Sequence, residues 1–406
     1  MSAAVDLASL EDAARLLRGV TTRTPVEESS SLSALAGTRV VLKCENLQRT
    51  GSFKLRGAYV RLSRLTAQER ARGVVAASAG NHGQGVAFAA RELGISAVVH
   101  MPRNAALPKV SATRDYGAEV RQDAPDLAGA IAAAEAECAQ TGRVFIPPFD
   151  HVDVVTGQGT IGLEILDQVP DVRTVLVPTG GGGLLAGVAA AVHARRPDVR
   201  VVGVQAAGAA AFPTSLAEGH PVALGRMSTM ADGIAVPAPS ELTLAIAREH
   251  VAEVRTVEEE DLARAMLLLS ERAKLVVEPS GAAGVAALLG GPGAFPGPVV
   301  VILSGGNVDT LVLYRILRHG LVSAGRYLQM DVRVPDQPGS LAGLLGVLAT
   351  TGSNVVSINH DRTGADLGVA EVQIRVELET KGTEHCREVL SALRGEGYGV
   401  VFHSVG

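Results

Sequence analysis

Lys54 is the residue whose type and setting could do covalent chemistry. It lies in the run Thr50-Gly51-Ser52-Phe53-Lys54-Leu55-Arg56-Gly57, near the start of a predicted helix and just after glycine and serine. An amine held out of water in such a place can attack a carbonyl and form a Schiff base. The competing interpretation is a surface lysine on an amphipathic helix, with packed methylenes and a solvated ammonium.

Three further segments, each at the end of a predicted strand, carry residues that suit a binding site. The runs are Ser78-Ala79-Gly80-Asn81-His82 after the strand 74–77, Gly180 to Gly183 after the strand 174–177, and Ser304-Gly305-Gly306-Asn307 after the strand 299–303. A lysine near a helix start is ordinary, but one accompanied by three such loops is not. The set therefore favours a reactive Lys54.

The four consecutive glycines from Gly180 to Gly183 indicate a phosphate site. Without a Cβ, several backbone N–H groups can turn toward one anion, and the predicted helix 184–194 adds partial positive charge at its N-terminus. A plain turn explains the run poorly, because four glycines are entropically costly. A nicotinamide-dinucleotide fold is a stronger competitor, since Gly181-x-Gly183-x-x-Ala186 fits its loose fingerprint. That fold also needs an acidic residue after the next strand, where Gln205 stands here.

The other two loops are weaker signals when each is taken alone. The segment 78–82 precedes the helical stretch 84–93, so its N–H groups are placed to hold a carboxylate at a helix N-terminus. Ser304 ends a strand, and a serine in that position is more often just a helix cap.

These segments, in this order, resemble those of the threonine and serine ammonia-lyases (dehydratases), which are pyridoxal-phosphate (PLP) enzymes of the tryptophan-synthase β-subunit fold. The resemblance covers roughly residues 5 to 320 and continues beyond them. It implies PLP bound covalently to Lys54, with Phe53 against the cofactor ring, Asn81 at the ring oxygen and Ser304 at the pyridine nitrogen. The phosphate would lie against Gly180, Gly181, Gly182, Gly183 and Leu184. The substrate carboxylate would lie against Ser78, Ala79, Gly80, Asn81 and His82.

The activity implied by the resemblance is β-elimination from L-threonine to give 2-oxobutanoate and ammonia, with L-serine to pyruvate as the related reaction. Lys54 would also remove the Cα proton. A serine at the pyridine nitrogen suits elimination, because it leaves the ring unprotonated. The runs 147–150 and 278–281 also match the family, as walls of the site. A role in isoleucine biosynthesis is expected.

Two rival functions stay open on the sequence. A serine racemase would share nearly every motif and would use a second acid/base on the opposite face of the substrate, for which Ser78 is the candidate. A catalytically idle amino-acid sensor could keep this fold, although the intact Lys54 argues against it. The preference between threonine and serine depends on the room for one methyl group, worth only ~1 to 3 kcal/mol.

No metal is expected. Relatives that bind a divalent ion near the site carry acidic residues after the strand 201–204, and this chain has Gln205 and Ala211 at those places. The three cysteines, Cys44, Cys138 and Cys386, are too far apart in the sequence for a disulfide framework or a paired metal knuckle. The ten histidines show no HExxH spacing.

Composition narrows the class of protein. The 406 residues are 47% apolar and 19% charged, which is typical of a globular chain with large cores. A net charge of −5 and the lack of a Lys/Arg block argue against nucleic acid as a partner. No apolar run reaches the ~18 residues of a membrane span, and the N-terminus carries Asp6, Glu11 and Asp12, so a cytoplasmic protein is expected.

The predicted fold class is α/β. From about 39 to 320, short β-branched runs alternate with Ala/Leu-rich helical stretches, as in parallel sheets with crossover helices. The resemblance implies two such sheets in a catalytic domain 1–322, with a smaller subdomain of about 45–145 inserted in a larger one. The loop-rich stretch 206–240 breaks the alternation and is predicted to be a lid or an interface.

A different pattern begins after Gly325. Alternating strands at 327–334 and 371–378, each followed by a predicted helix, indicate an antiparallel sheet covered on one face. This βαββαβ order and the Pro338-Gly339 turn resemble an ACT domain, a small amino-acid-sensing module, over 326–406. Isoleucine or valine is the expected effector, bound between subunits of a homodimer or homotetramer by Pro338, Gly339, Ser340 and Asn354. The alternative is a ferredoxin-like dimerisation module that binds nothing.

Overall fold

The computed structural model describes residues 5–362 and 367–402, which fall into two compact units, Met1–Thr310 and Leu311–Gly406. The first unit contains two sheets and the second contains one. The division falls at the start of α14 (Thr310–Ser323), whereas the sequence placed the boundary after this helix. Each unit is described here by itself.

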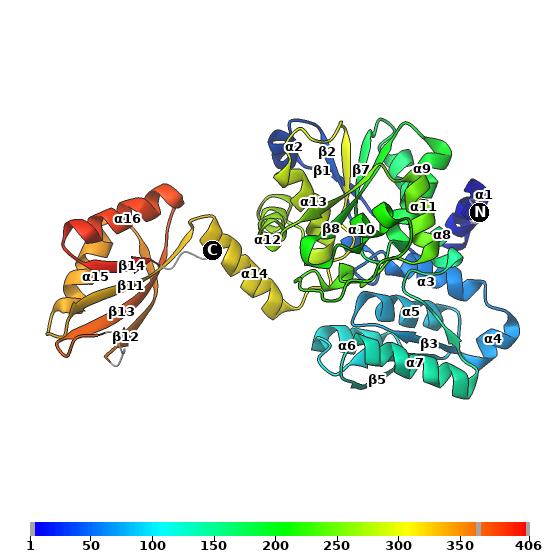
Figure 1. Cartoon of the computed structure of the whole chain (residues 1–406), viewed down its shortest axis with the longest axis horizontal. Coiled ribbons are helices and arrows are strands. Elements are labelled where there is room, and N and C mark those ends of the chain that lie inside the picture. Colours follow the sequence, from blue (N-terminus) through cyan, green and yellow to red (C-terminus); the bar gives the residue numbers. More distant parts are fainter. Residues whose placement is uncertain (1–4, 363–366, 403–406) are drawn as a thin grey trace. The chain divides into compact units, whose positions relative to one another are not determined.

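A six-stranded sheet is the centre of the larger part of the first unit, with the strand order β1-β2-β10-β7-β8-β9 (Figure 1). Only β1, at one edge, is antiparallel to its neighbour; the other pairs are parallel. The predicted α/β class with parallel strands is therefore confirmed. The strands are β1 (Val26–Glu28), β2 (Val40–Lys43), β7 (Thr174–Pro178), β8 (Arg200–Ala206), β9 (Glu253–Val257) and β10 (Val299–Ile302).

Helices cover both faces of this sheet, which explains why its central strands are apolar without alternation. On one face, Val175, Val177 and Val300 pack with apolar side chains of α8 (Val152–Gln168) and α9 (Gly183–Arg195). On the other face, α13 (Pro279–Gly290) approaches so closely that a Cβ on Gly284 would lie 2.7 Å from Val301 Cγ1. The remaining helices around this sheet are α1 (Leu7–Leu16), α2 (Ser30–Ala36), α10 (Ala211–Glu218), α11 (Glu241–His250) and α12 (Glu259–Leu268).

A second, four-stranded parallel sheet, in the order β5-β4-β3-β6, forms a smaller subdomain, and its strands lie within the range of about 45–145 that the family resemblance implied. Val74 and Ala76 pack against α3 (Lys54–Ser63) and α5 (Asn81–Glu92), while Val75 and Ala77 face α7 (Leu127–Thr141). The strands are β3 (Val74–Ala77), β4 (Ala97–Pro102), β5 (Glu119–Ala124) and β6 (Val144–Phe145). The other helices are α4 (Ala67–Arg72) and α6 (Leu107–Asp115).

The stretch 206–240 is less irregular than its composition predicted. It contains α10 and two short 3₁₀ turns, η3 (Ala207–Ala209) and η4 (Asp232–Ile234). The amide of the buried Gln205 explains part of this order, since its Oε1 accepts a hydrogen bond from Phe212 N, 2.9 Å away, in the first turn of α10. Such a side chain gives an otherwise free N–H group of a helix terminus a partner.

The second unit has the predicted βαββαβ order, and its strands form an all-antiparallel sheet β12-β13-β11-β14. On β13 buried and exposed residues alternate, and the buried ones pack under the two helices. Its elements are β11 (Tyr327–Pro335), α15 (Ser340–Thr350), β12 (Asn354–Asp361), β13 (Glu371–Glu379), α16 (Thr383–Gly395) and β14 (Gly399–Phe402). None of the helices within 5–362 and 367–402 is long and apolar enough to cross a membrane.

Candidate active site

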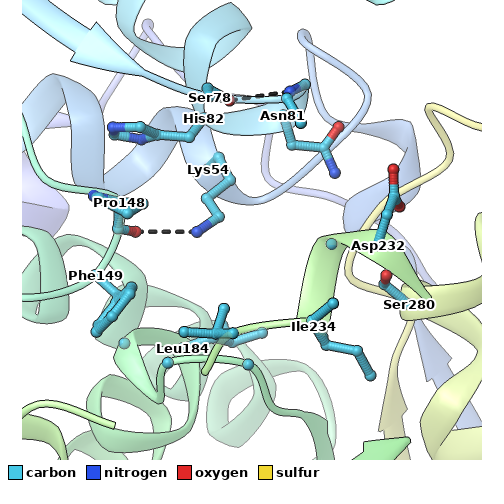
Figure 2. Close-up of a pocket in the computed structure, with 18 of the residues that line it drawn as sticks. Lys54, Ser78, Asn81, His82, Pro148, Phe149, Leu184, Asp232, Ile234 and Ser280 are labelled. Carbon is cyan, nitrogen blue, oxygen red and sulfur yellow. Dashed lines mark hydrogen bonds between the residues drawn. The ribbon is translucent and has the colours of Figure 1, made fainter. Parts of the chain in front are cut away.

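A cavity of about 300 Å³ lies where the loops after β3, β7 and β10 meet the start of α3. The carboxyl ends of parallel strands gather loops at one edge, and this arrangement brings the four chemical segments together. Figure 2 shows Lys54 in the middle of the cavity, with Ser78 and Asn81 on one side and Leu184 on the other. Every predicted catalytic, cofactor-binding and substrate-binding residue lines it: Phe53, Lys54, Ser78, Ala79, Gly80, Asn81, His82, Gly180, Gly181, Gly182, Gly183, Leu184 and Ser304.

Lys54 is the first residue of α3, and its ammonium nitrogen donates to the carbonyl oxygen of Pro148 at 2.9 Å (Figure 2). Burial lowers the pKa of this amine to about 8, although the nearby Glu278 carboxylate works in the opposite direction. A larger fraction of Lys54 is therefore neutral near pH 7 to 8 than of an ordinary lysine. A neutral amine is the nucleophilic form.

The glycine loop presents unused hydrogen-bond donors. Gly181, Gly182 and Gly183 are buried, and in the described part of the chain no hydrogen bond uses their N–H groups or that of Leu184. Buried N–H groups are rarely left without a partner, so a ligand is expected there. The helix α9 begins at Gly183, so its dipole adds positive charge at the same place. These donors fit the phosphate of PLP.

Packing explains why glycines form this loop. Gly182 has φ +93°, in the left-handed region, and a Cβ on it would lie 2.4 Å from the ring of Phe212. A Cβ on Gly181 would lie 2.4 Å from the ring of Phe149. The two phenylalanines therefore leave room only for glycine in this part of the cavity wall.

The loop 78–82 is a second group of free donors. The hydroxyl of Ser78 accepts a hydrogen bond from Gly80 N at 3.0 Å, which closes the turn before α5. Among the described residues, none accepts from the N–H groups of Ala79, Asn81 or His82. The arrangement suits a carboxylate, as the sequence predicted.

His82 lies in this loop, but its side chain makes a hydrogen bond outside the loop, to the backbone of Ile146. Its Nε2 is 2.8 Å from the carbonyl oxygen of Ile146, and burial lowers its pKa to about 3. The ring is therefore neutral and donates to that carbonyl. As a hydrogen-bond donor, His82 can therefore offer a substrate only its backbone N–H.

Asn81 and Glu278 form a buried pair at one wall. The amide nitrogen of Asn81 donates to Glu278 Oε1 at 2.6 Å, and its oxygen accepts from Asn307 at 2.9 Å. Burial raises the pKa of Glu278 to about 7, while its Oε2 has no hydrogen-bond partner among the described residues. The sequence placed Glu278 only in a wall of the site; the structure makes it a titratable group beside Asn81.

Several residues of the pocket were not predicted from the sequence, and three of them matter for its chemistry or shape. Lys109 (α6), Asp232 and Ile234 (both η4) line the cavity, although they belong to segments that carry no recognised motif. One compositional signal pointed to Lys109: only five of the 37 basic residues are lysine, and Lys54 and Lys109 are two of them. Because arginine is so much more frequent in this chain, a lysine indicates a position where the two side chains are not interchangeable.

The structure does not bring the four predicted effector residues together within one copy. Gly339, with φ +96°, follows the end of β11 at Pro335. Asn354 instead pairs with Glu379, which pairs with Tyr327 at the start of β11. At ~3.3 Å per residue, the length of this strand puts Asn354 and the Pro338-Gly339-Ser340 turn roughly 25 Å apart. They can share a ligand only if a second copy supplies one of them.

Within the described ranges, no group of three or more His, Cys, Asp or Glu side chains is placed to hold a metal ion. Gln205 and Ala211, the positions named for a metal in relatives, instead stand at the end of β8 and the start of α10.

Comparisons with known proteins agree with this site. A family model described as "Pyridoxal-phosphate dependent enzyme" matches residues 17–305. An L-threonine ammonia-lyase of Thermotoga maritima is 44% identical over 98% of this chain and 99% of its own length. The solved threonine deaminase of T.th. is 42% identical, with a TM-score of 0.72, over 75% of this chain and 99% of that one. Maize serine racemase is 35% identical, with a TM-score of 0.73, over 78% of this chain and 98% of that one.

The chain therefore belongs to the pyridoxal-phosphate-dependent enzymes and, among them, to the threonine ammonia-lyase family. Its cofactor is pyridoxal 5′-phosphate, which the donors of the glycine loop and the amine of Lys54 suit. When bound, this cofactor withdraws electrons from the Cα of an amino acid.

Proposed function

We propose that the protein eliminates water from L-threonine, giving 2-oxobutanoate and ammonia, and acts in the same way on L-serine to give pyruvate. The observation that carries this proposal is the Lys54 amine, which lies in one cavity between two loops with free N–H groups. The names of the relatives, L-threonine ammonia-lyase and threonine deaminase, support threonine as the substrate.

The roles of this chain's residues follow from their chemistry. The glycine loop holds the cofactor phosphate, and the loop 78–82 holds the substrate carboxylate. Lys54 takes the Cα proton, and the Cβ–O bond then breaks with loss of the hydroxyl as water. The released enamine rearranges to an imine, which water hydrolyses to the 2-oxoacid and ammonia.

The test is a product assay on the purified protein loaded with PLP. L-Threonine should yield 2-oxobutanoate and ammonia in equal amounts, and serine should yield pyruvate. A preparation with full cofactor content that forms neither oxoacid would refute the proposal, and would favour an amino-acid sensor.

Serine racemase is the second candidate, because maize serine racemase shares this fold and Ser78 lines the same cavity as Lys54. Chiral analysis of the serine recovered from the same assay separates the two. A D-serine yield well above the pyruvate yield would favour the racemase.

We further propose that residues 326–406 form an ACT domain that binds isoleucine or valine and regulates the enzyme in isoleucine biosynthesis in the cytoplasm. The Pro338-Gly339-Ser340 turn would hold one end of the effector, and Asn354 of a second copy in a homodimer or homotetramer would hold the other. This need for a second copy follows from the separation of the turn and Asn354 along β11. A protein that stays monomeric at all working concentrations would exclude this arrangement.

A further inference from the structure

Lys109 and Asp232 form an ion pair between two segments that border the cavity. Lys109 lies in the first turn of α6, in the smaller subdomain, and Asp232 begins η4, which contacts α13. Lys109 Nζ is 2.8 Å from Asp232 Oδ2, and the side chain of Lys109 is 10% exposed against 56% for Asp232. The buried partner is therefore the cation, and Figure 2 shows Asp232 at the rim of the cavity.

The stem of Lys109 lies directly against the loop 78–82. A Cβ added to Gly80 would be 2.6 Å from Lys109 Cδ and 3.3 Å from Lys109 Nζ. Any larger residue than glycine at position 80 would therefore displace this lysine. The ammonium ends beside the same loop whose Ala79, Asn81 and His82 N–H groups have no acceptor among the described residues.

The side chain of Lys109 is protonated at neutral pH. Burial alone would lower its pKa, but the attraction of Asp232 and then of Glu278 more than compensates, and the net pKa is raised. The lysine is thus cationic throughout the range in which the enzyme would be assayed.

Few other cations are available in this cavity. Among the described lining residues the basic side chains are Lys54, His82 and Lys109. Lys54 carries the cofactor under the proposed function, and the ring of His82 is neutral and bonded to Ile146. Among the described lining residues, Lys109 is therefore the one positively charged side chain left to bind an anionic substrate group at the loop 78–82.

We propose that Lys109 is a substrate-binding residue, whose ammonium holds the α-carboxylate of the amino acid together with the free N–H groups of the loop 78–82. Asp232 is its positioning residue, because it keeps the ammonium at the loop while no substrate is bound. This inference rests on the proposed function, since it supposes an amino acid in the cavity. It adds a side-chain charge to a site otherwise built of backbone donors.

The test compares two ligands that differ only in the carboxylate. L-Alanine and L-alaninamide both have an amine but no β-hydroxyl to eliminate, so their binding to the PLP-loaded protein is followed by the change in cofactor absorption. Lys109→Met should weaken L-alanine binding by roughly ten- to a hundred-fold, the range of a charge-assisted hydrogen bond. L-Alaninamide binding should change less than about twofold, since no carboxylate is lost.

Two further variants separate binding from structure. Lys381→Met, which removes an exposed lysine of the second unit, should leave both affinities unchanged. Lys109→Arg keeps the charge and should recover part of the L-alanine affinity. With L-threonine, Lys109→Met should raise KM much more than it lowers kcat, because the carboxylate is bound in both the ground state and the transition state.

Equal weakening of both ligands, or no weakening of either, would overturn the assignment and leave the ion pair as a tie between α6 and η4. Because the readout is binding, it does not depend on turnover. If the wild-type protein binds L-alanine but forms no oxoacid from threonine, the proposed reaction fails while the role of Lys109 is still tested.

Discussion

At the scale of single residues, the chemistry depends on how the protein surrounds one amine. The amine of Lys54 donates to the Pro148 carbonyl, and its burial lowers its pKa to about 8. An ordinary lysine has a pKa of ~10.4 and is almost wholly protonated at neutral pH. Burial alone thus favours the neutral amine, which can act as a nucleophile and as a base.

Lys54→Ala should abolish turnover, because the variant loses the covalent attachment and the base together. We expect a loss of roughly 10³-fold or more in kcat, with unchanged circular dichroism. Residual activity above about one per cent of wild type would show that another group takes the Cα proton. Lys274→Ala, a change outside the cavity, serves as the control.

The lowered pKa of Lys54 predicts how fast the cofactor-free protein takes up PLP. The neutral amine reacts, so the rate should rise with pH and level off above about pH 8, the pKa of the buried amine. Stopped-flow absorption between pH 6 and 10 gives the profile. A rate still climbing at pH 10 would mean that Lys54 titrates like an exposed lysine.

Ser304→Asp tests the predicted contact with the pyridine nitrogen. A carboxylate there would keep that nitrogen protonated and oppose elimination, so kcat should fall sharply while cofactor content stays full. Ser304 is 3% exposed and lines the cavity, so the variant also needs a check of PLP content by absorption. An unchanged kcat would place Ser304 away from the nitrogen.

At the scale of elements, the loops after β3, β7 and β10 hold the site because their strands are buried and fixed. The glycine loop shows this best, since Phe149 and Phe212 leave no space for a Cβ at Gly181 or Gly182. The conformation of this loop is thus set by its packing against the two rings.

Replacing Gly181 by Val should weaken cofactor retention, because the new side chain meets the ring of Phe149 and displaces the loop. PLP content after dialysis is the measurement, and at least a tenfold weaker affinity is expected. Gly290→Ala, where a Cβ meets nothing within 4 Å, is the matched control. Full retention by the Val variant would separate this loop from the phosphate.

The sequence predicted the elements that carry a strong local signal. The buried strands β3, β7, β8 and β10 were all confirmed, because short, unbroken β-branched runs between turns are typical of buried strands. The strand β5 was not assigned, since Glu119–Ala124 is polar and mostly half-exposed. Local pattern does not reveal an edge strand whose partners lie elsewhere in the chain.

The same limit explains the missed contacts between site residues. Asp232 and Lys109 are 123 positions apart, and Glu278 and Asn81 are 197 positions apart, yet both pairs are in hydrogen-bond contact. Motifs located Lys54 and the three loops because each is recognisable by itself. The Lys109–Asp232 pair forms only when the folded chain brings α6 and η4 together at the cavity, so no local sequence pattern predicts it.

At the scale of the whole molecule, the chain joins a catalytic unit to a second unit with its own core. The helix α14 belongs almost entirely to the second unit, and within that unit its Arg318 pairs with Glu377 of β13 at 2.7 Å. The family model ends at residue 305, before this helix. The natural place to separate the two units is therefore close to Thr310.

A protein ending at Thr310 should keep its threonine turnover and lose any response to isoleucine or valine. Coupling between such sites typically amounts to ~1 to 3 kcal/mol, which appears as a several-fold to hundred-fold shift in apparent threonine affinity. Steady-state kinetics at millimolar isoleucine, on the full chain and on the shorter one, give the comparison. A full-length enzyme that ignores every branched-chain amino acid would reduce the second unit to a dimerisation element.

The position of the cofactor tests the account most directly. Because the chain has only five lysines, Lys43, Lys54, Lys109, Lys274 and Lys381, covalent attachment of PLP can be assigned without ambiguity. The PLP-loaded protein is reduced with borohydride, digested and analysed by mass spectrometry. The account predicts the phosphopyridoxyl group on the peptide that contains Lys54, at close to one per chain. Attachment at any of the other four lysines, with Lys54 unmodified, would contradict it.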